Sequence, residues 1–494
     1  MELEVSMNVF LTGATGFIGR ALVLSLQRRG HTVIAWVRSP ERARSQLGDD
    51  VELLSVAAGD DLLVEALKRC DGVINLAGEP LFGKRWTRAR KKQIVDSRVA
   101  LTARLVKAMG QTGRPSSVLV SASAVGYYGD RGDERIDEDS APETDFLARL
   151  CRDWEQAALA AQSDQLRVVC LRIGIVFGRG GGAFEEMTPM FRRGVGGPIG
   201  SGRQYVPWIH LHDCVEMIAT ALLDERVSGP INVVGPDPIP NKEMAKTFGK
   251  VLRRPAVMPV PRLALLALFG KAAEVLAAGQ RAHPVKMEAL GFEFRFTTFE
   301  QTLRDLLNDD EVSIDAIGPD TPAPKDKNTY LDRRTPRSVL ATRTVLDAPI
   351  DAVFSFFSKP ANLGLLTPPH MKFTIERTDA TMESGATIDY RLRVFGIGIG
   401  WRTRIECWEL GKCFVDSQVR GPYRAWWHEH HFFDDGGRTV MEDRVYYAVP
   451  LGILGRLVNR LIVAGQLRSI FTYRAAAIRF RFGAPSSLAL DTGP

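Results

Sequence analysis

Three glycines at positions 13, 16 and 19 directly follow a short apolar run near the start of the chain. The run, residues 9–11, indicates a β-strand, and the apolar spacing after the glycines indicates a helix. Glycine permits φ > 0 in such a turn, allows a ligand close to the backbone and lets the helix pack tightly on the strand. With a second strand predicted at 32–37, the segment forms a βαβ unit whose helix N-terminus suits a dinucleotide pyrophosphate.

The end of the second strand indicates which dinucleotide this is. An acidic residue there hydrogen-bonds the ribose 2′-hydroxyl of NAD(H), whereas a basic residue accommodates the 2′-phosphate of NADP(H). The strand ends in Arg38 and Ser39, so the sequence predicts NADP(H). The alternative is that Arg38 is only a solvated residue at the end of a strand.

The alternation of apolar strands and helices continues beyond this unit. It predicts a doubly wound α/β Rossmann domain over residues 1–306, whose last part, 241–306, is a small helical C-terminal extension. From 307 to 336 the chain has few apolar residues and several prolines, which is typical of a linker. Residues 484–494 are expected to be a disordered tail.

The stretch 337–483 has a different pattern. Most of its segments alternate apolar and polar residues with a period near two, and a long helix is expected from about 452 to 482. Such alternation is typical of an antiparallel sheet with one covered face. The sequence therefore predicts a second, α+β domain in which a sheet and a long final helix form a helix-grip arrangement.

Composition excludes several classes of function. The net charge is +6, from 64 basic and 58 acidic residues, and the basic residues are not clustered, so we expect no nucleic-acid partner. The six cysteines form no C-x-x-C pair, as is usual for reduced intracellular proteins. No apolar run approaches the ~20 residues of a transmembrane segment, and no signal peptide precedes the first strand. We expect a cytoplasmic protein with a small-molecule substrate.

Several motifs occur in the order found in one known group of proteins. They are TGATGFIG at 12–19, LAGE at 76–79, SASAVGYYG at 121–129, GVGGPIGSG at 194–202 and WIH at 208–210. Over residues 7–306 the chain resembles the extended short-chain dehydrogenase/reductase superfamily, in the branch of NAD-dependent epimerases/dehydratases labelled epimerase family proteins. The resemblance implies an NADP(H) site formed by Gly13, Gly16, Phe17, Ile18, Gly19, Arg38, Leu76, Ala77, Gln93, Arg98 and Ile175.

The chain departs from that superfamily at the catalytic pair. Its enzymes generally use a Tyr-x-x-x-Lys pair, in which the lysine lowers the pKa of the tyrosine so that it acts as general acid/base. The corresponding positions here are Leu147 and Cys151. The serine of the site, Ser123, is retained, and the candidates for a relocated acid/base are Tyr127, Tyr128 and His210.

Two functions are compatible with this departure. In the first, the domain is an NADP(H)-dependent oxidoreductase or epimerase-like enzyme whose acid/base has moved. In the second, it is a non-catalytic NADP(H)-binding regulator or sensor. The two tyrosines then only pack the edge of the sheet, and His210, which alternates with apolar neighbours, is a structural histidine.

The second domain resembles the START-like polyketide cyclase/dehydrase superfamily through APIDAVF at 348–354, LTPP at 366–369 and GPYR at 421–424. This resemblance implies a hydrophobic cavity between sheet and final helix that takes an apolar or lipid ligand. The basic final helix also has the composition of a membrane-surface helix, although the superfamily pattern favours packing on the sheet. His428 and His430 share one face of a strand and His431 the other, so without a recognisable third ligand no metal is predicted.

Overall fold

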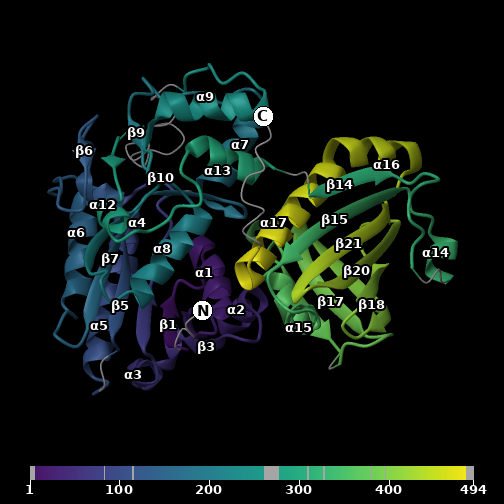
Figure 1. Cartoon of the computed structure of the whole chain (residues 1–494), viewed down its shortest axis with the longest axis horizontal. Helices are drawn as coiled ribbons and strands as arrows, with labels where there is room; N and C mark the ends of the chain where they lie inside the picture. The colour runs from purple at the N-terminus through teal and green to yellow at the C-terminus, as the bar shows by residue number, and fades with distance from the viewer. Residues whose placement is uncertain are drawn as a thin grey trace. The chain divides into compact units, whose positions relative to one another are not determined.

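The computed structural model describes residues 6–82, 84–113, 116–260, 278–308, 311–325, 329–379, 381–394 and 396–484. Two compact units divide the chain: residues 1–40 with 51–307, and residues 41–50 with 308–494 (Figure 1). The middle of the predicted helical extension, 261–277, lies outside the described residues. So does the predicted tail from residue 485 onward.

The first unit is built on a seven-stranded sheet whose order is β11-β7-β5-β4-β1-β2-β3 (Figure 1). All its neighbouring pairs are parallel. The strands are β1 (Asn8–Thr12), β2 (Thr32–Val37), β3 (Glu52–Ser55), β4 (Gly72–Asn75), β5 (Val118–Ala124), β7 (Arg167–Ile173) and β11 (Gly229–Val233). This order, which reverses direction between β1 and β4, confirms the predicted Rossmann-type fold.

Helices cover the sheet because its strands are apolar on both faces. On one face, side chains of α3, α5 and α6 pack with strand residues such as Phe10, Val73 and Leu119. α1 packs with α8. The helices of this part are α1 (Phe17–Arg28), η1 (Val56–Ala58), α3 (Asp60–Lys68), α4 (Arg88–Val95), η2 (Asp96–Ala100), α5 (Leu101–Gly110), η3 (Val125–Tyr128), α6 (Phe146–Leu159) and α8 (Leu211–Leu223). The helix α2 (Pro40–Leu47) follows β2 in the chain, but residues 41–50 group with the second unit.

Short strand pairs and further helices complete the first unit around an aromatic cluster of Phe177, Phe191, Trp208, Phe248 and Phe299. The helices expected in the extension are present in its described part. These elements are β6 (Arg135–Ile136), β8 (Ile175–Gly178), α7 (Gly182–Arg192), β9 (Tyr205–Val206), β10 (Trp208–His210), β12 (Ile239–Pro240), α9 (Asn241–Leu252), β13 (Arg281–Ala282), α12 (Val285–Ala289) and α13 (Phe299–Leu307).

The second unit contains an eight-stranded sheet of order β14-β15-β21-β20-β19-β18-β17-β16, with all neighbouring pairs antiparallel. The predicted antiparallel sheet is confirmed. Its strands are β14 (Val312–Ala316), β15 (Ser338–Leu346), β16 (Thr374–Thr378), β17 (Thr387–Val394), β18 (Ile397–Glu409), β19 (Cys413–Arg420), β20 (Ala425–Asp435) and β21 (Arg438–Ala448).

The predicted linker needs a correction, because β14 and the short helix α14 (Thr329–Arg333) lie inside it. β14 pairs with β15, and Val312 and Ile314 pack into the core of the second unit beside Leu340 and Phe471. The strand alternates apolar and polar residues. Acidic and proline-rich neighbours hide that short alternation in the composition.

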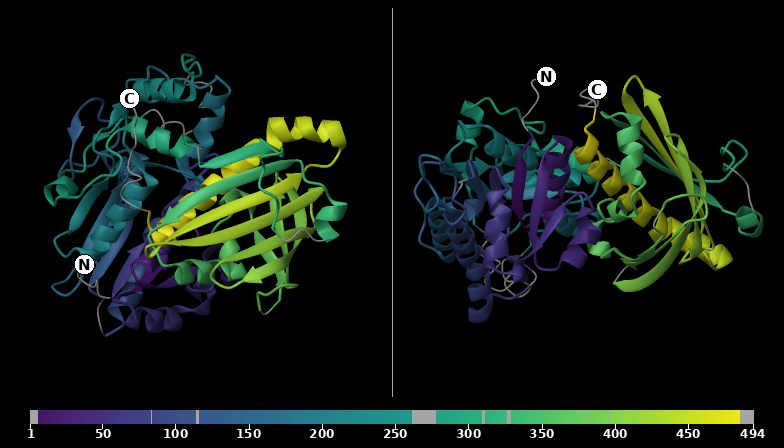
Figure 2. Two further views of the ribbon diagram at one scale, coloured as in Figure 1. Left: turned by 45° about the vertical axis from the view of Figure 1, so that its right-hand side comes forward. Right: turned by 90° about the horizontal axis from the view of Figure 1, so that it is seen from below.

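One long helical run closes the second unit, as predicted. α16 (Gly452–Val458), the π-turn η7 (Asn459–Val463) and α17 (Ala464–Phe482) follow one another without a break. In both views of Figure 2, α17 runs along the curved sheet, and Leu467 and Phe471 pack with Trp426 and Val445 of the sheet. The remaining helices are α15 (Ile350–Phe357), η5 (Pro360–Gly364) and η6 (Pro369–Met371).

Among the helices that the structure describes, none combines the length and the apolar character needed to cross a membrane.

A buried ion pair joins α6 to β7 in the first unit. Nε and Nη2 of Arg172 each donate to one carboxylate oxygen of Glu155 at 2.9 Å, and both side chains are less than one tenth exposed. Burial alone would lower the pKa of Arg172, but the hydrogen bonds to Glu155 outweigh it and raise that pKa. The guanidinium of Arg172 is therefore charged inside the protein.

We predict that Glu155→Ala lowers the free energy of unfolding of the first unit by about 3–5 kcal/mol, because it leaves the charge of Arg172 buried without its carboxylate counter-ion. Glu65→Ala, which removes the exposed ion pair with Lys68, should change it by no more than about 1 kcal/mol. The free energy of unfolding of each variant is measured in a urea titration, in which hydrogen exchange of peptides from β5 and β7 reports unfolding of the first unit. Equal effects of the two substitutions would contradict the prediction.

Candidate functional site

The glycine turn between β1 and α1 brings bare backbones into contact. Gly13 has φ +73°, and a Cβ on it would lie 2.7 Å from the carbonyl carbon of Leu76. A Cβ on Gly19 would lie 2.2 Å from the carbonyl oxygen of Gly13. Gly16 caps α1 without a side-chain hydrogen bond and is exposed. The first amides of α1 therefore face an accessible turn, where an anion is favoured.

A chain of polar contacts fixes the carboxyl ends of the neighbouring strands. Oγ1 of Thr12 donates to Asn75 at 2.6 Å and accepts from the amide of Ala77 at 3.1 Å. Nδ2 of Asn75 donates to Oγ1 of Thr102 at 2.8 Å and to Oγ of Ser121 at 3.2 Å. These bonds hold the backbone of Leu76 and Ala77 beside the glycine turn, at the edge where ligands of such sheets bind.

Phe17 links the turn to the loop after β8. Its ring lies so close that a Cβ on Gly181 would come within 2.7 Å of it. The neighbouring Ile18 is half-buried. Ile175 starts β8, where its amide donates to the carbonyl of Pro207 at 2.7 Å. The cofactor roles of these three side chains stay predictions.

The basic residues predicted for the cofactor site occupy two places. Arg38 is exposed at the end of β2. Arg98 lies on the π-turn η2, where it donates to the carbonyl of Glu79 at 3.0 Å and stacks 5.2 Å from the ring of Trp154. Gln93 is exposed on α4. Arg98 thus lies beside the loop after β4, and Arg38 follows the end of β2; the roles of these residues toward a cofactor stay predictions.

Two of the predicted catalytic residues are engaged in the interior. Oγ of Ser123 donates to Glu155 at 2.7 Å. The hydroxyl of Tyr128 accepts from Arg172 at 2.9 Å and donates to Asn232 at 2.7 Å. Burial is the main cause that raises the pKa of Tyr128. Both side chains therefore stabilise the junction of α6, β5 and β7 in this conformation.

His210 and Tyr127 differ in how accessible they are. His210 is buried, caps α8 by accepting from the amide of His212 at 3.0 Å, and lies 3.3 Å from Asp305 through Nε2. Tyr127 is the least buried of the four predicted catalytic residues, and the guanidinium of Arg172 lies 3.6 Å from its ring centre. Tyr127 is the best placed of them to meet a ligand.

Leu147 and Cys151, which the sequence analysis matched to the catalytic pair of the superfamily, lie next to the turn that follows β5. A Cβ on Gly126 would lie 3.4 Å from Cβ of Leu147 and 3.9 Å from Sγ of Cys151. Burial raises the pKa of Cys151 to about 12, so its thiol is protonated at neutral pH. Neither side chain supplies acid/base chemistry there.

The second unit contains a cavity of about 570 Å³. Apolar and aromatic side chains from the sheet and the helices form most of its wall, while one region is polar, with Asp416, His428, His430 and Arg474. The apolar lining includes Leu363, Phe373, Leu392, Ile399, Trp401, Trp426, Leu467, Ile470 and Phe471.

The polar region holds opposite charges close together. Burial opposes ionisation of His428, but its contacts with Asp416 and Asp443 outweigh this and raise its pKa. Burial also opposes ionisation of Asp416, yet the hydrogen bond from His428 lowers its pKa below the usual value. Burial and the neighbouring charge of His428 lower the pKa of His430.

Asp416 was missed by the sequence analysis because it comes from another strand. It lies directly opposite His428 in the pairing of β19 with β20, and its side chain groups with those of His428 and His430. The acid stands 12 residues from the nearest of these histidines in the sequence. The alternation of β19 places Asp416 on the covered face of the sheet. Only the register between β19 and β20 shows that Asp416 lies next to the two histidines.

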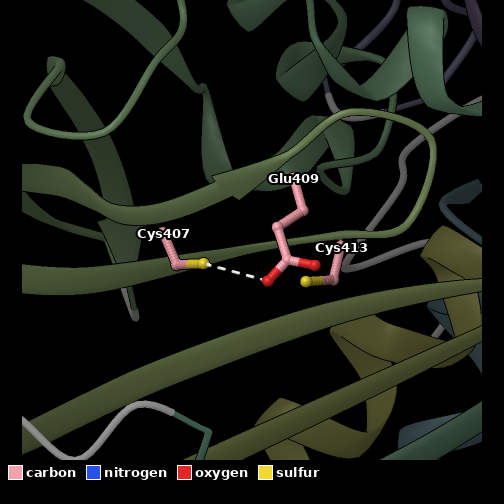
Figure 3. Close-up of side chains that lie close together, drawn as sticks. All are labelled: Cys407, Glu409 and Cys413. Carbon is pink, nitrogen blue, oxygen red and sulfur yellow. Dashed lines mark hydrogen bonds between the residues drawn. The ribbon is translucent and has the colours of Figure 1, made fainter.

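A second group of potential ligands consists of Cys407, Glu409 and Cys413 (Figure 3). They come from the adjacent strands β18 and β19. Nζ of Lys325 lies 2.6 Å from Oε1 of Glu409 and 2.8 Å from Sγ of Cys413. An ammonium group therefore already occupies the place that a cation would take.

Comparisons with known proteins match the first unit. Residues 9–235 match the NAD dependent epimerase/dehydratase family, and residues 260–306 match a domain of unknown function, DUF1731. The chloroplastic epimerase family protein SDR39U1 homolog of Arabidopsis thaliana is 40% identical over 309 residues, which are 62% of this chain and 88% of the relative. An epimerase family protein of Mycobacterium tuberculosis is 38% identical over 60% of this chain and 96% of its own.

Solved structures give the same result. The human epimerase family protein SDR39U1, crystallised with NADPH, is 36% identical with a TM-score of 0.55, covering 61% of this chain and 99% of its own. A nucleoside-diphosphate sugar epimerase from Corynebacterium glutamicum is 31% identical with a TM-score of 0.50, covering 62% of this chain and 59% of its own. The chain therefore belongs to the NAD dependent epimerase/dehydratase family.

Proposed function

We propose that the first unit binds NADP(H) at the glycine turn and acts on a small-molecule substrate as an oxidoreductase or epimerase-like enzyme. The observation that carries the proposal is the turn itself. Its backbones approach too closely for side chains, and the N-terminus of α1 is capped by an exposed glycine. Such a turn suits the pyrophosphate of a dinucleotide.

Arg38 supports NADP(H) over NAD(H). It is exposed at the carboxyl end of β2, where dinucleotide sites of this fold recognise the adenosine ribose. The human relative was crystallised with NADPH, which is consistent with the same preference here. A guanidinium at this place pairs with a 2′-phosphate, and an NAD(H)-selective site would have an acid instead.

We predict that the full chain binds NADPH more tightly than NADH, and that Arg38→Ala narrows this preference by about tenfold, the equivalent of one charged hydrogen bond of about 1.4 kcal/mol. Calorimetric titration with NADPH and with NADH gives the ratio of the two affinities for each variant. Arg152→Ala, an exposed arginine on α6, is the matched control and should leave the ratio unchanged. Equal affinities of the unaltered protein for both cofactors would refute the NADP(H) assignment.

Tyr127 is the proposed acid/base of the enzyme. It is half-buried beside the end of β5, and Arg172 places a positive charge over its ring. Tyr128 and His210 have their polar atoms engaged by protein groups.

The alternative is a non-catalytic NADP(H)-binding regulator or sensor. It is favoured by the replacement of the usual catalytic pair by Leu147 and Cys151, and by the hydrogen bond that engages Ser123 with Glu155. In this alternative the dinucleotide binds with the same residues. Only turnover separates the two functions.

We predict turnover in a screen that follows NADPH fluorescence for the reduction of aromatic ketones and lipid aldehydes. Epimerisation of sugar nucleotides consumes no net NADPH, so the same screen follows it by NMR of the sugar. Tyr127→Phe should lower kcat at least about 100-fold, the lower range for loss of a general acid/base, and leave NADPH affinity unchanged. Tyr128→Phe and His210→Ala, which alter the other two candidates for the acid/base, should lower kcat less than Tyr127→Phe does. Turnover that survives all three substitutions would refute the acid/base assignment, and NADPH binding without turnover on any substrate would favour the regulator.

We further propose that the second unit is a START-like, helix-grip domain whose cavity takes an apolar or lipid ligand. The cavity size is within the range of about 300–1,000 Å³ that is usual for small-molecule sites. Its wall is mostly apolar, and Leu451, which belongs to the wall, is 72% exposed. The alternating sheet with a long helix along it supports this assignment.

We predict that a fluorescent long-chain fatty acid binds the full chain and that Ile470→Trp, which adds bulk to the cavity wall, weakens binding at least about tenfold. Val419→Trp is the matched control, because Val419 is 45% exposed on β19. Fluorescence titration gives both affinities. Equal loss in the two variants, or none in Ile470→Trp, would show that the ligand binds elsewhere.

A further inference from the structure

The polar region of the cavity has the spacing of a metal site. Oδ2 of Asp416 lies 3.4 Å from Nδ1 of His428 and 3.4 Å from Nε2 of His430. These distances are long for hydrogen bonds, whose usual length is about 2.9–3.0 Å. Metal bonds of about 2.0–2.2 Å at tetrahedral angles put ligand atoms about 3.3–3.6 Å apart. Both distances from the carboxylate oxygen to the rings therefore match the separation that a shared ion produces, and one ligand atom of each residue lies within 4.8 Å of the others.

A second carboxylate faces the other nitrogen of each ring. Oδ1 of Asp443 lies 2.6 Å from Nδ1 of His430 and 3.6 Å from Nε2 of His428. Metal-bound histidines usually donate their second ring N–H to a carboxylate, which fixes the tautomer and the ring orientation. The two imidazoles are thus placed between one carboxylate that can bind an ion and one that can orient them.

The charges of the cluster also suit a cation. Arg474 approaches both a carboxylate and a ring: its Nε lies 3.5 Å from Oδ2 of Asp443, and its Nη2 lies 3.1 Å from Nδ1 of His430. Arg474 neutralises that carboxylate, whereas Asp416 faces the two rings. A divalent ion bound by Asp416 and both rings would neutralise this largely buried carboxylate.

We propose that Asp416, His428 and His430 bind one divalent transition-metal ion at the polar end of the cavity. Two imidazoles and a carboxylate suit ions such as Zn²⁺ and Fe²⁺. All three side chains line the cavity, so a coordination position of the ion is open to it, as in sites that bind a further ligand. A ligand with an oxygen-containing head group would meet the ion there, and this last statement rests on the proposed apolar ligand.

The test uses the full chain, freed of metals with a chelator, without any cavity ligand. Calorimetry with Zn²⁺ should give one equivalent per chain. Co²⁺ should give visible absorption bands without the strong near-ultraviolet band of a thiolate ligand. Absence of binding, or a thiolate band that Cys413→Ser removes, would overturn the proposal, the second by placing the ion at the group of Figure 3.

Variants separate the proposed ligands from their neighbours. His428→Gln and His430→Gln should abolish binding of one equivalent, and Asp443→Asn should weaken it about 10–100-fold, the usual effect of losing an orienting carboxylate. His431→Gln is the matched control, because His431 is on the same strand and contacts Glu429 instead. Equal affinities in His430→Gln and His431→Gln would overturn the proposal.

A measurement on the unaltered protein covers the case in which a variant fails to fold. X-ray absorption of the Co²⁺-loaded chain should show two imidazole nitrogens and oxygen ligands around the metal. A first shell that contains sulfur, or only oxygen ligands, would overturn the assignment. Because no dinucleotide or fatty acid is present, a failure here is distinct from a failure of the proposed function.

Discussion

Contact between bare backbones at Gly13 and Gly19 is the constraint on which the first unit depends. Any side chain at either position would collide with backbone atoms of the turn or of the loop after β4. The same absence of side chains brings α1 against β1 and leaves the start of α1 accessible. The packing of the central helix and the affinity for a pyrophosphate therefore have one physical origin. A chain that folds this way keeps the cofactor site even when the residues of its usual chemistry have changed.

Buried charges have different consequences in the two units. In the first, Arg172 and Glu155 use their hydrogen bonds on each other and on neighbouring protein groups. This network joins α6 to β7, and it leaves few hydrogen-bond donors and acceptors of Arg172 and Glu155 for a ligand. In the second, Asp416, His428 and His430 line a cavity, and Oδ2 of Asp416 lies 3.4 Å from one nitrogen of each ring. Charged groups that line a cavity can bind something that enters it.

The sequence predicted the layers of both units because hydrophobic period is a local property. Continuously apolar strands indicated a sheet covered on both faces, and alternating strands indicated a sheet covered on one. The linker was partly wrong, since β14 is short and its neighbours are acidic or proline-rich. The sequence identified the candidate acids and bases by residue type, but it did not show which groups their side chains contact. Whether the hydroxyl of Tyr128 faces a ligand or Asn232 depends on side chains more than 100 residues away.

The sequence by itself determined the glycine turn, the basic residue at the end of β2 and the residues Leu147 and Cys151 at the positions predicted for the catalytic pair. These features lie within single segments, and their chemistry follows from residue type and local spacing. The tertiary structure alone decided that Asp416 stands opposite His428, and that Asp443 faces the same rings from β21. The physical reason is the strand register, which depends on the packing of both faces of the sheet, and a shift of one residue would turn each side chain to the opposite face.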